Sequence, residues 1–379
     1  MTQHVEEFLK PCTYLFKIFG IYSLDINHAS RRNTVGVIWS LSILLYSITH
    51  SIYGIYGRKV HFKSLLLTIT DTMQLYIALV NAAVSTLFLL LMRRKLSFFL
   101  QKLSNFDRSF AALDAVANVQ KTYKPHVTSL TLMMIVTICC YTWLDVILYV
   151  KEFSFVFIGD VMAYCFPFII ALLIIVQFCL MTLLLKRRFF WINRKLVQIE
   201  KHLNKKSLVI DPLESKKIIK ILEILRHKHD RLCRLSVTLN KVYSLPLLMT
   251  TLQNFIIIIV TLFLHVEDSK PLKKDHSRVL YIIFDSMIII YSCAEIVMMV
   301  KACSTTRSEA KLTATILHRF QKTSQDMDHF VEFFSMQLMH SGVEFSACKI
   351  FVIDESLLFS MVGAISTYLI IVLQLQLGD

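Results

Sequence analysis

Seven apolar runs, each long enough to cross a bilayer, constrain the fold of this chain more than any other feature. They lie at 35–57, 69–92, 128–150, 161–185, 244–265, 279–300 and 350–375. About 20 apolar residues in a helix span the hydrocarbon core of a bilayer, which is about 30 Å thick. We therefore expect an all-α membrane protein with seven transmembrane helices.

The composition is that of a membrane protein. The chain has 379 residues, of which 55% are hydrophobic, with only 8 Gly and 6 Pro, and its mean hydropathy is +0.57. Such values exclude an ordinary soluble domain and leave little room for long loops. Residues 1–34 lack a basic cluster followed by an apolar core, so we expect the first span to serve as the insertion signal.

The Lys and Arg residues predict the orientation in the membrane. If the N-terminus is cytoplasmic, 33 of the 41 Lys and Arg residues fall in cytoplasmic segments, and 16 of these lie in 186–243. Positively charged loops stay on the cytoplasmic side, so we expect a cytoplasmic N-terminus and an extracellular C-terminus. The net charge of +14 is then a signal of topology. We expect no nucleic acid partner, because the basic residues are spread over several loops.

The last apolar run differs from a simple lipid anchor because it carries a row of small and polar residues. Positions three, four and seven apart share one face of a helix. The row consists of Ser360, Gly363, Thr367 and Gln374, with Ile370 and Ile371 closing the gap. Small residues of this kind bring membrane helices close together, and polar ones also line pores. The row alone leaves both interpretations open.

Two segments predicted to be cytosolic carry amphipathic helical patterns. In 186–243, Asp211, Pro212 and Glu214 make a strong helix start, and the helix should run into the fifth span near Pro246. The apolar positions after that start are Ile218, Ile219, Leu222, Leu225, Leu232 and Leu235.

The second amphipathic pattern, Lys311 to Met339, precedes the seventh span. Its apolar face consists of Phe320, Met327, Phe330, Phe334 and Leu338. An apolar stripe on a cytosolic helix serves packing within one subunit, binding to the membrane surface or assembly with other subunits. The pattern by itself does not rank these three uses.

Over about its last forty residues the chain resembles the insect gustatory receptors. Thr367, Tyr368, five apolar residues and Gln374 match the C-terminal signature of that family. The matching positions upstream are Phe345, Ser346, Ala347, Cys348, Phe351, Asp354, Leu357 and Leu358. The chain departs from the family in having Leu375 where Phe is usual, which leaves open a wider or less tightly closed gate, and Lys349 where Gly is more frequent.

The resemblance implies a ligand-gated, non-selective cation channel in the plasma membrane of gustatory neurons. It also implies a homotetramer or heterotetramer with a central pore, and we expect the two cytosolic apolar stripes to pack between subunits. The implied pore and gate residues are Gln374, Leu375, Thr367, Ser360 and Ile371. Gln374 and Leu375 would lie near the outer mouth.

The expected domain organisation follows from the spans and the resemblance. Residues 1–34 form a cytoplasmic segment, and 35–300 form a six-helix ligand-binding bundle that includes the cytosolic helical loop 186–243. Residues 301–349 form a cytoplasmic anchor segment. Residues 350–379 form the pore-lining helix and a short extracellular tail.

The outer halves of the second to sixth spans are where we expect a small-molecule ligand, because clefts between helices are the usual sites in bundles. The candidate residues are Asp71, Gln74, Trp143, Asp145, Tyr149, Tyr164, Phe168, Tyr281, Asp285 and Tyr291. Intramembrane acids are costly and often functional, and aromatic rings offer stacking surfaces. Trp and Tyr also serve as interface anchors. Glu295 is expected to be a structural, hydrogen-bonded or paired group.

Other functional classes fit less well. The sequence has no Ser/His/Asp arrangement, His/Cys cluster or phosphate-cradling glycine loop, so we expect no enzyme, cofactor or metal. A heptahelical G-protein-coupled receptor is the alternative, although the charge distribution puts the N-terminus inside. Leu369 follows Tyr368 where sugar receptors of the resembled family have Glu, which favours a bitter or aversive tastant and leaves a fructose-like sugar possible.

Overall fold

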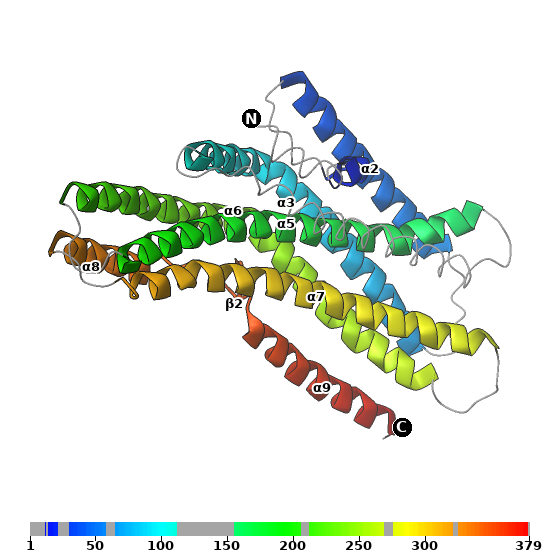
Figure 1. Cartoon of the computed structure of the whole chain (residues 1–379). Coiled ribbons are helices and arrows are strands. Elements are labelled where there is room, and N and C mark those ends of the chain that lie inside the picture. The colour runs from blue at the N-terminus through cyan, green and yellow to red at the C-terminus, as the bar shows by residue number, and fades with distance from the viewer. Residues whose placement is uncertain are drawn as a thin grey trace. The chain divides into compact units, whose positions relative to one another are not determined.

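A computed structural model describes residues 12, 14–21, 30–57, 65–111, 155–205, 212–268, 276–320 and 325–377. These residues form an all-helical membrane protein with one small β-ribbon (Figure 1). The helices are α2 (Ser30–Gly57), α3 (Leu65–Ala111), α5 (Phe155–Lys205), α6 (Pro212–Asp268), α7 (His276–Leu317), α8 (Gln325–His340) and α9 (Glu355–Leu377). The antiparallel strands are β1 (Ser346–Ala347) and β2 (Phe351–Val352).

The predicted spans correspond to helices wherever the structure describes them, with one correction. Four described helices are long and apolar enough to cross a membrane: Thr72–Phe110, Cys165–Asn204, Leu213–His265 and Asp285–Leu317. Thr34–Thr49 and Glu355–Ile371 form shorter apolar helices. The predicted span 128–150 lies outside the described residues. The predicted start of the last span at 350 is wrong, because Phe351 and Val352 form β2 and α9 begins at Glu355.

The long helices continue past their apolar runs. The helix predicted from Asp211–Glu214 is confirmed: α6 begins at Pro212, passes Pro246 and reaches Asp268 over 57 residues, a length of about 85 Å. The α5 helix likewise continues beyond the predicted end of its span at 185 to Lys205. Charged residues end the apolar run and leave the helix intact.

The chain divides into two compact units, which we describe separately. Unit 1 comprises the chain up to Gln177, Val242–Met298 and the residues from Ser356 onward, and unit 2 comprises Phe178–Lys241 and Met299–Glu355. In unit 1, α2 packs against α3. A buried apolar cluster takes one residue from each of four helices: Ala78 of α3, Phe168 of α5, Ile257 of α6 and Ile288 of α7.

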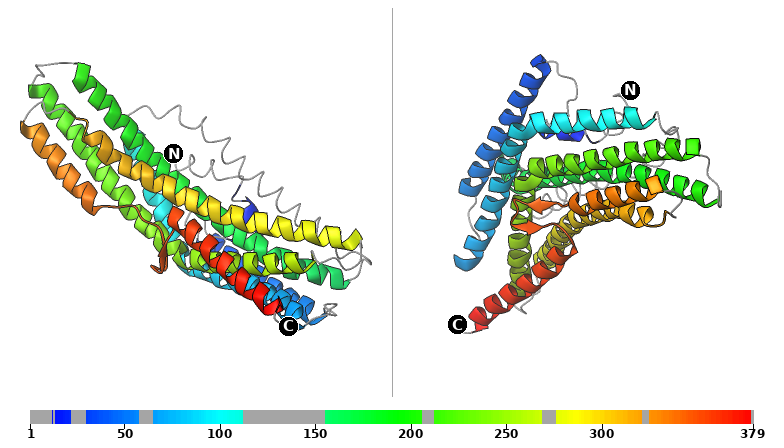
Figure 2. Two further views of the ribbon diagram at one scale, coloured as in Figure 1. Left: turned by 90° about the horizontal axis from the view of Figure 1, so that it is seen from below. Right: turned by 90° about the vertical axis from the view of Figure 1, so that its left-hand side faces the viewer.

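Unit 2 is a helical bundle built from the charged extensions of α5, α6 and α7 together with α8. Figure 2 shows α8 (orange) running beside α6 and α7, and Arg226 of α6 hydrogen bonds to Gln337 of α8. Asn193 joins α5 to α7, since its Nδ2 donates to the Glu309 carbonyl oxygen at 2.8 Å and its Oδ1 accepts from Thr313 at 2.7 Å.

The apolar faces predicted to pack between subunits lie mostly in the core of unit 2. The buried members are Ile218, Leu222, Leu225, Leu232, Leu235, Phe320, Met327 and Phe334. Ile219, Phe330 and Leu338 are half-buried. The expected assignment of these faces to intersubunit contacts is therefore wrong, because the helices of one chain bury them against each other. The predicted stretch 311–339 is also divided, since α7 ends at Leu317 and α8 begins at Gln325.

Candidate pore helix and ligand-binding bundle

The predicted pore stripe lies on the exposed side of α9 in the single subunit. Ser360, Gly363, Thr367, Ile371 and Gln374 are all exposed. A Cβ atom added at Gly363 would have no neighbouring atom within 4 Å. Close packing of the stripe against another described helix of the same chain therefore does not account for its small residues.

The hydroxyl groups of the stripe donate their hydrogens to the helix backbone. Ser360 Oγ donates to the carbonyl oxygen of Ser356 at 3.0 Å, and Thr367 Oγ1 donates to that of Gly363 at 3.0 Å. Each exposed hydroxyl oxygen then keeps its lone pairs for an outside partner. Oxygen atoms of this kind suit a passing cation.

Tyr368 follows Thr367 of the stripe directly in the sequence. The Tyr368 ring makes an edge-to-face contact with Phe255 of α6, with 6.2 Å between ring centroids and an interplanar angle of 80°. The contact joins α9 to α6 within unit 1. The side chain of Leu375, the gate candidate next to Gln374, lies outside the described residues.

A hairpin leads into α9. Ser346 pairs with Val352 and Ala347 with Phe351, and the connecting turn has positive φ at Cys348 (49°) and Lys349 (62°). Positive φ is the conformation that glycine adopts at little cost. Lys349 is the position where the resembled family more often has Gly, and its backbone conformation gives the physical reason for that preference.

Four ligand-site candidates have described side chains, and all four are on helices of unit 1. Gln74, Phe168 and Asp285 are buried and Tyr291 is partly buried. Gln74 Nε2 donates to Thr261 Oγ1 of α6 at 3.3 Å. Tyr291 packs on the apolar cluster that contains Phe168, and its hydroxyl oxygen lies 3.4 Å from the Phe168 carbonyl oxygen. The structure thus brings Phe168 and Tyr291 together.

The other ligand-site candidates cannot be placed in the same way. Trp143, Asp145 and Tyr149 lie outside the described residues. Asp71, Tyr164 and Tyr281 belong to α3, α5 and α7, and their side chains lie outside the described part.

Glu295 is buried and hydrogen bonded, as expected, and the structure identifies its partners. The Tyr291 hydroxyl donates to its Oε1, and Asn254 Nδ2 donates to its Oε2 at 2.9 Å. The hydrogen bonds tie α7 to α6 in the apolar bundle. These hydrogen bonds satisfy the Glu295 carboxyl group, whose burial without partners would cost free energy.

A second polar network joins α3 to α6 and was not predicted. Asn81 Nδ2 donates to Gln253 Oε1 and to Thr250 Oγ1, the latter at 3.2 Å, and Ser85 Oγ donates to Asn81 Oδ1 at 2.7 Å. These side chains are buried. The available sequence signal was the presence of Asn and Gln inside apolar runs, since buried amides need partners.

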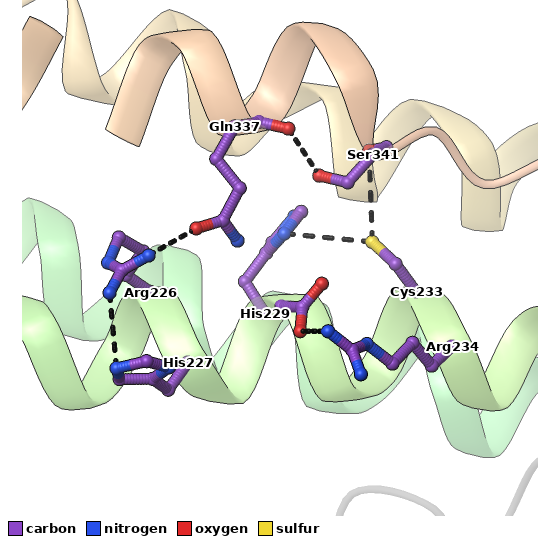
Figure 3. A network of polar contacts seen from close by, with 8 residues as sticks. Arg226, His227, His229, Cys233, Arg234, Gln337 and Ser341 are labelled. Atoms are coloured by element: carbon purple, nitrogen blue, oxygen red, sulfur yellow. Dashed lines mark hydrogen bonds and ion pairs between the residues drawn. The ribbon is translucent and has the colours of Figure 1, made fainter. Parts of the chain in front are cut away.

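In unit 2, a polar network around the buried His229 links α6 to α8 (Figure 3). Arg226 Nη1 donates to Gln337 Oε1 at 2.6 Å, and the Cys233 thiol lies 3.9 Å from the carbonyl oxygen of Ser341. His229 lies between the rings of Phe189 and Phe334, with centroids 5.1 and 6.2 Å away. Its Nε2 is 3.4 Å from the Ala310 carbonyl oxygen.

Burial controls the ionisation of this network. Desolvation lowers the pKa of His229 to about 4 despite the opposing effects of the Ala310 hydrogen bond and Asp230. The imidazole is therefore neutral at pH 7, with Nε2–H donating to Ala310 and Nδ1 facing the Cys233 thiol 3.7 Å away. Desolvation also raises the pKa of Cys233 to about 12, so its thiol is protonated and unreactive.

Comparison with known proteins identifies the family. The model of the 7tm chemosensory receptor family matches residues 9–378. The chain belongs to this family. Among curated proteins, it is 25% identical to gustatory receptor 28b of Drosophila melanogaster over 97% of its own length and 85% of that protein. It is also 28% identical to the Drosophila gustatory receptor for bitter taste 66a, over 40% of its own length and 29% of that receptor.

A solved structure shows the same fold for another chemosensory receptor. The insect olfactory receptor OR5 from Machilis hrabei, in complex with eugenol, superposes with a TM-score of 0.70 and 12% sequence identity, covering 99% of each chain. The resemblance to insect gustatory receptors that rested on the last forty residues is confirmed and extends over nearly the whole chain. The protein is a multi-pass membrane chemosensory receptor, and its family is not enzymatic.

Proposed function

We propose that this chemosensory receptor is a subunit of a ligand-gated, non-selective cation channel that opens when a small-molecule tastant binds. The observation that carries the proposal is the exposed polar stripe on α9. An apolar helix that presents Ser360, Thr367 and Gln374 on a face not covered by its own chain needs water or another subunit on that face. A ring of such helices supplies both.

The channel would be a homotetramer or a heterotetramer with related receptors, with seven spans per subunit. The N-terminus would be cytoplasmic and the C-terminus extracellular, which puts Gln374 and Leu375 near the outer mouth of the pore. The channel would lie in the plasma membrane of gustatory neurons. The domain division would follow the sequence expectation for segment 1–34, bundle 35–300 and anchor 301–349. In the last part, 350–379, the pore helix is α9, which begins at Glu355.

The ligand would bind in the helical bundle of unit 1, beside Phe168 and Tyr291. A bitter or aversive compound is favoured, and the similarity to a receptor for bitter taste supports it. A fructose-like sugar is the second possibility. Opening then follows from tighter binding to the open state, since a ligand shifts an equilibrium only by its differential affinity.

The test is the inward cation current of cells that display the tagged protein, with G-protein signalling blocked, across sugars, alkaloids and amino acids. We expect a ligand-evoked current that Gln374→Ala alters. Val362→Ala is the control, because Val362 is exposed on α9 and no member of the stripe lies three, four or seven residues from it. A G-protein-coupled receptor would instead give no current, and its C-terminal tag would stain only permeabilised cells.

A further inference from the structure

The hairpin before α9 is held in a conformation that its own sequence does not favour. Ile350 N–H donates to the Ala347 carbonyl oxygen at 2.9 Å, and the two central residues of this turn, Cys348 and Lys349, both have positive φ. This is the type I′ pattern, which strongly prefers Asn and Gly. A turn with Cys and Lys at these positions persists only where surrounding contacts determine it.

Asn240 of α6 supplies one such contact with both ends of its amide group. Its Oδ1 accepts from the Ser346 backbone N–H at 3.0 Å, and its Nδ2 donates to Ser346 Oγ at 3.3 Å. The Phe345 ring, which is 2% exposed, meets the Phe178 ring of α5 edge to face at 5.8 Å. The first strand is therefore fixed to two helices of unit 2.

The second strand is fixed at the residue that precedes α9. Ile353 N–H donates to the Phe345 carbonyl oxygen at 2.8 Å and closes the ribbon. Arg307 Nη1 of α7 donates to Asp354 Oδ2 at 3.3 Å. Asp354 directly precedes the first helical residue, Glu355, which is the N-cap position where a carboxylate is favoured.

From these contacts we propose that the segment Phe345–Asp354 is a clamp that sets the direction of α9, with Asn240 and Arg307 as its positioning residues. The proposal rests on the proposed channel function and assigns a role to the upstream half of the C-terminal signature. The α9 helix has 23 residues and is about 35 Å long. A tilt of roughly 5° at its base displaces its far end by roughly 3 Å, enough to alter a pore constriction.

The test changes the clamp without touching the pore stripe. Asn240→Leu removes both hydrogen bonds to Ser346, whereas Asn240→Asp keeps the acceptor for the backbone N–H. Arg307→Asp and Asp354→Arg each break the ion pair, and the double exchange restores opposite charges. The matched control is the same exchange at Arg234 and Asp230, an ion pair of 2.9 Å on α6 of unit 2.

The readouts are the half-maximal ligand concentration, the current without ligand per surface receptor, and hydrogen exchange of the Ser346–Phe359 amides. The side chains of Arg307 and Asp354 are 33% and 29% exposed, so we expect each single charge reversal to shift the half-maximal concentration about two- to fivefold. The double exchange should recover only part of the shift, because it restores the opposite charges but still removes the Asp354 carboxylate from the N-cap of α9. Asn240→Leu should speed hydrogen exchange of the Ser346–Phe359 amides and shift the half-maximal ligand concentration. Asn240→Asp should change both quantities less.

Two results would overturn different claims. In the first, every clamp variant keeps the half-maximal ligand concentration of the wild type, while hydrogen exchange rises in Asn240→Leu. This result would show that the hairpin is only structural, and it would overturn the positioning role alone. A wild-type receptor at the surface that gives no ligand-evoked current would overturn the proposed channel function.

Discussion

Phe255 of α6 and Tyr368 of α9 meet edge to face, with ring centroids 6.2 Å apart and ring planes at 80°. Tyr368 belongs to the signature of the last helix, yet it lies beside the polar stripe, and the residue is 52% exposed. Its contact with Phe255 is an aromatic contact that joins the candidate pore helix to α6 of unit 1. This geometry assigns Tyr368 a packing role.

Removing the Tyr368 ring should weaken the attachment of α9 to α6. Aromatic pairs of this geometry contribute about 0.5–1.5 kcal/mol beyond the area they bury. We expect Tyr368→Leu to change the half-maximal ligand concentration by about two- to tenfold, and Tyr368→Phe to leave it within twofold. The measurement is the concentration dependence of the current at matched surface expression. Equal effects of Leu and Phe would contradict a role for the ring.

Stability should fall in mild acid because His229 is buried in its neutral form. Its pKa in the folded protein is about 4, below the 6.5 of an exposed histidine, so the stabilisation is fully present above pH 6.5 and is lost as the pH falls toward 4. Between pH 7 and pH 5 the protonation of His229 in the unfolded chain should lower the free energy of unfolding by about 2 kcal/mol.

The His229→Gln variant isolates this effect, since glutamine does not titrate and can still donate to Ala310. We expect thermal unfolding in detergent to lose less stability between pH 7 and pH 5 in the variant than in the wild type. An identical loss in both proteins would show that His229 does not carry the acid sensitivity.

The Glu295 carboxyl group should tolerate replacement by an amide better than by an apolar side chain. Asn254 Oδ1 has no hydrogen-bond partner, so the Asn254 amide can turn by 180° and let this oxygen accept from a glutamine NH₂ at position 295, while the Tyr291 hydroxyl still donates to the glutamine oxygen. Glu295→Leu removes the acceptor of the Asn254 Nδ2 group and leaves the Tyr291 hydroxyl with the longer contact to the Phe168 carbonyl oxygen, and a lost buried hydrogen-bond partner costs about 1–3 kcal/mol. Thermal unfolding should rank wild type and Glu295→Gln close together and Glu295→Leu well below. The reverse order would contradict the assigned hydrogen bonds.

Glycine at position 349 should stabilise the hairpin. Lys349 has φ of 62°, a conformation that costs a non-glycine residue about 1 kcal/mol. Lys349→Gly should slow hydrogen exchange of the Ser346–Val352 amides several-fold. Ile350→Gly is the control, because Ile350 is exposed and its φ is not positive, so added flexibility there should speed exchange. Faster exchange in Lys349→Gly would contradict the type I′ turn.

Hydropathy predicted where the apolar helices lie and could not predict where they end. The apolar run 161–185 marks part of α5, which continues to Lys205 because Lys and Arg are good helix formers. The start of α6 at Pro212 was predictable, since N-cap and first-turn chemistry is local. The hairpin was missed because Phe351 and Val352 extend the apolar run of the last span, and Cys348 and Lys349 carry no turn signal.

For the candidate site too, part could be predicted from the sequence and part could not. The stripe on α9 follows from helical periodicity, and its exposed members fit that expectation. The partners of Glu295 and the Asn81 network depend on which helices are neighbours, and one sequence does not contain that information. The apolar stripes of α6 and α8 show the same limit, because periodicity reveals an apolar face without revealing what covers it.

Thiol accessibility along α9 tests the central claim most directly. Cysteine is placed singly at Ser360, Gly363, Thr367, Gln374 or Val362. In the background protein, Cys293 and Cys348, which are exposed among the described cysteines, are changed to serine, and so are Cys139 and Cys140, which lie outside the described residues. A charged, membrane-impermeant thiol reagent is then applied from outside during ligand-evoked current. The account predicts block at the four stripe positions, fastest at Gln374, and no block at Val362, which is exposed in the subunit but lies off the stripe. Block at Val362 with unchanged current at the stripe positions would contradict a pore lined by this face of α9.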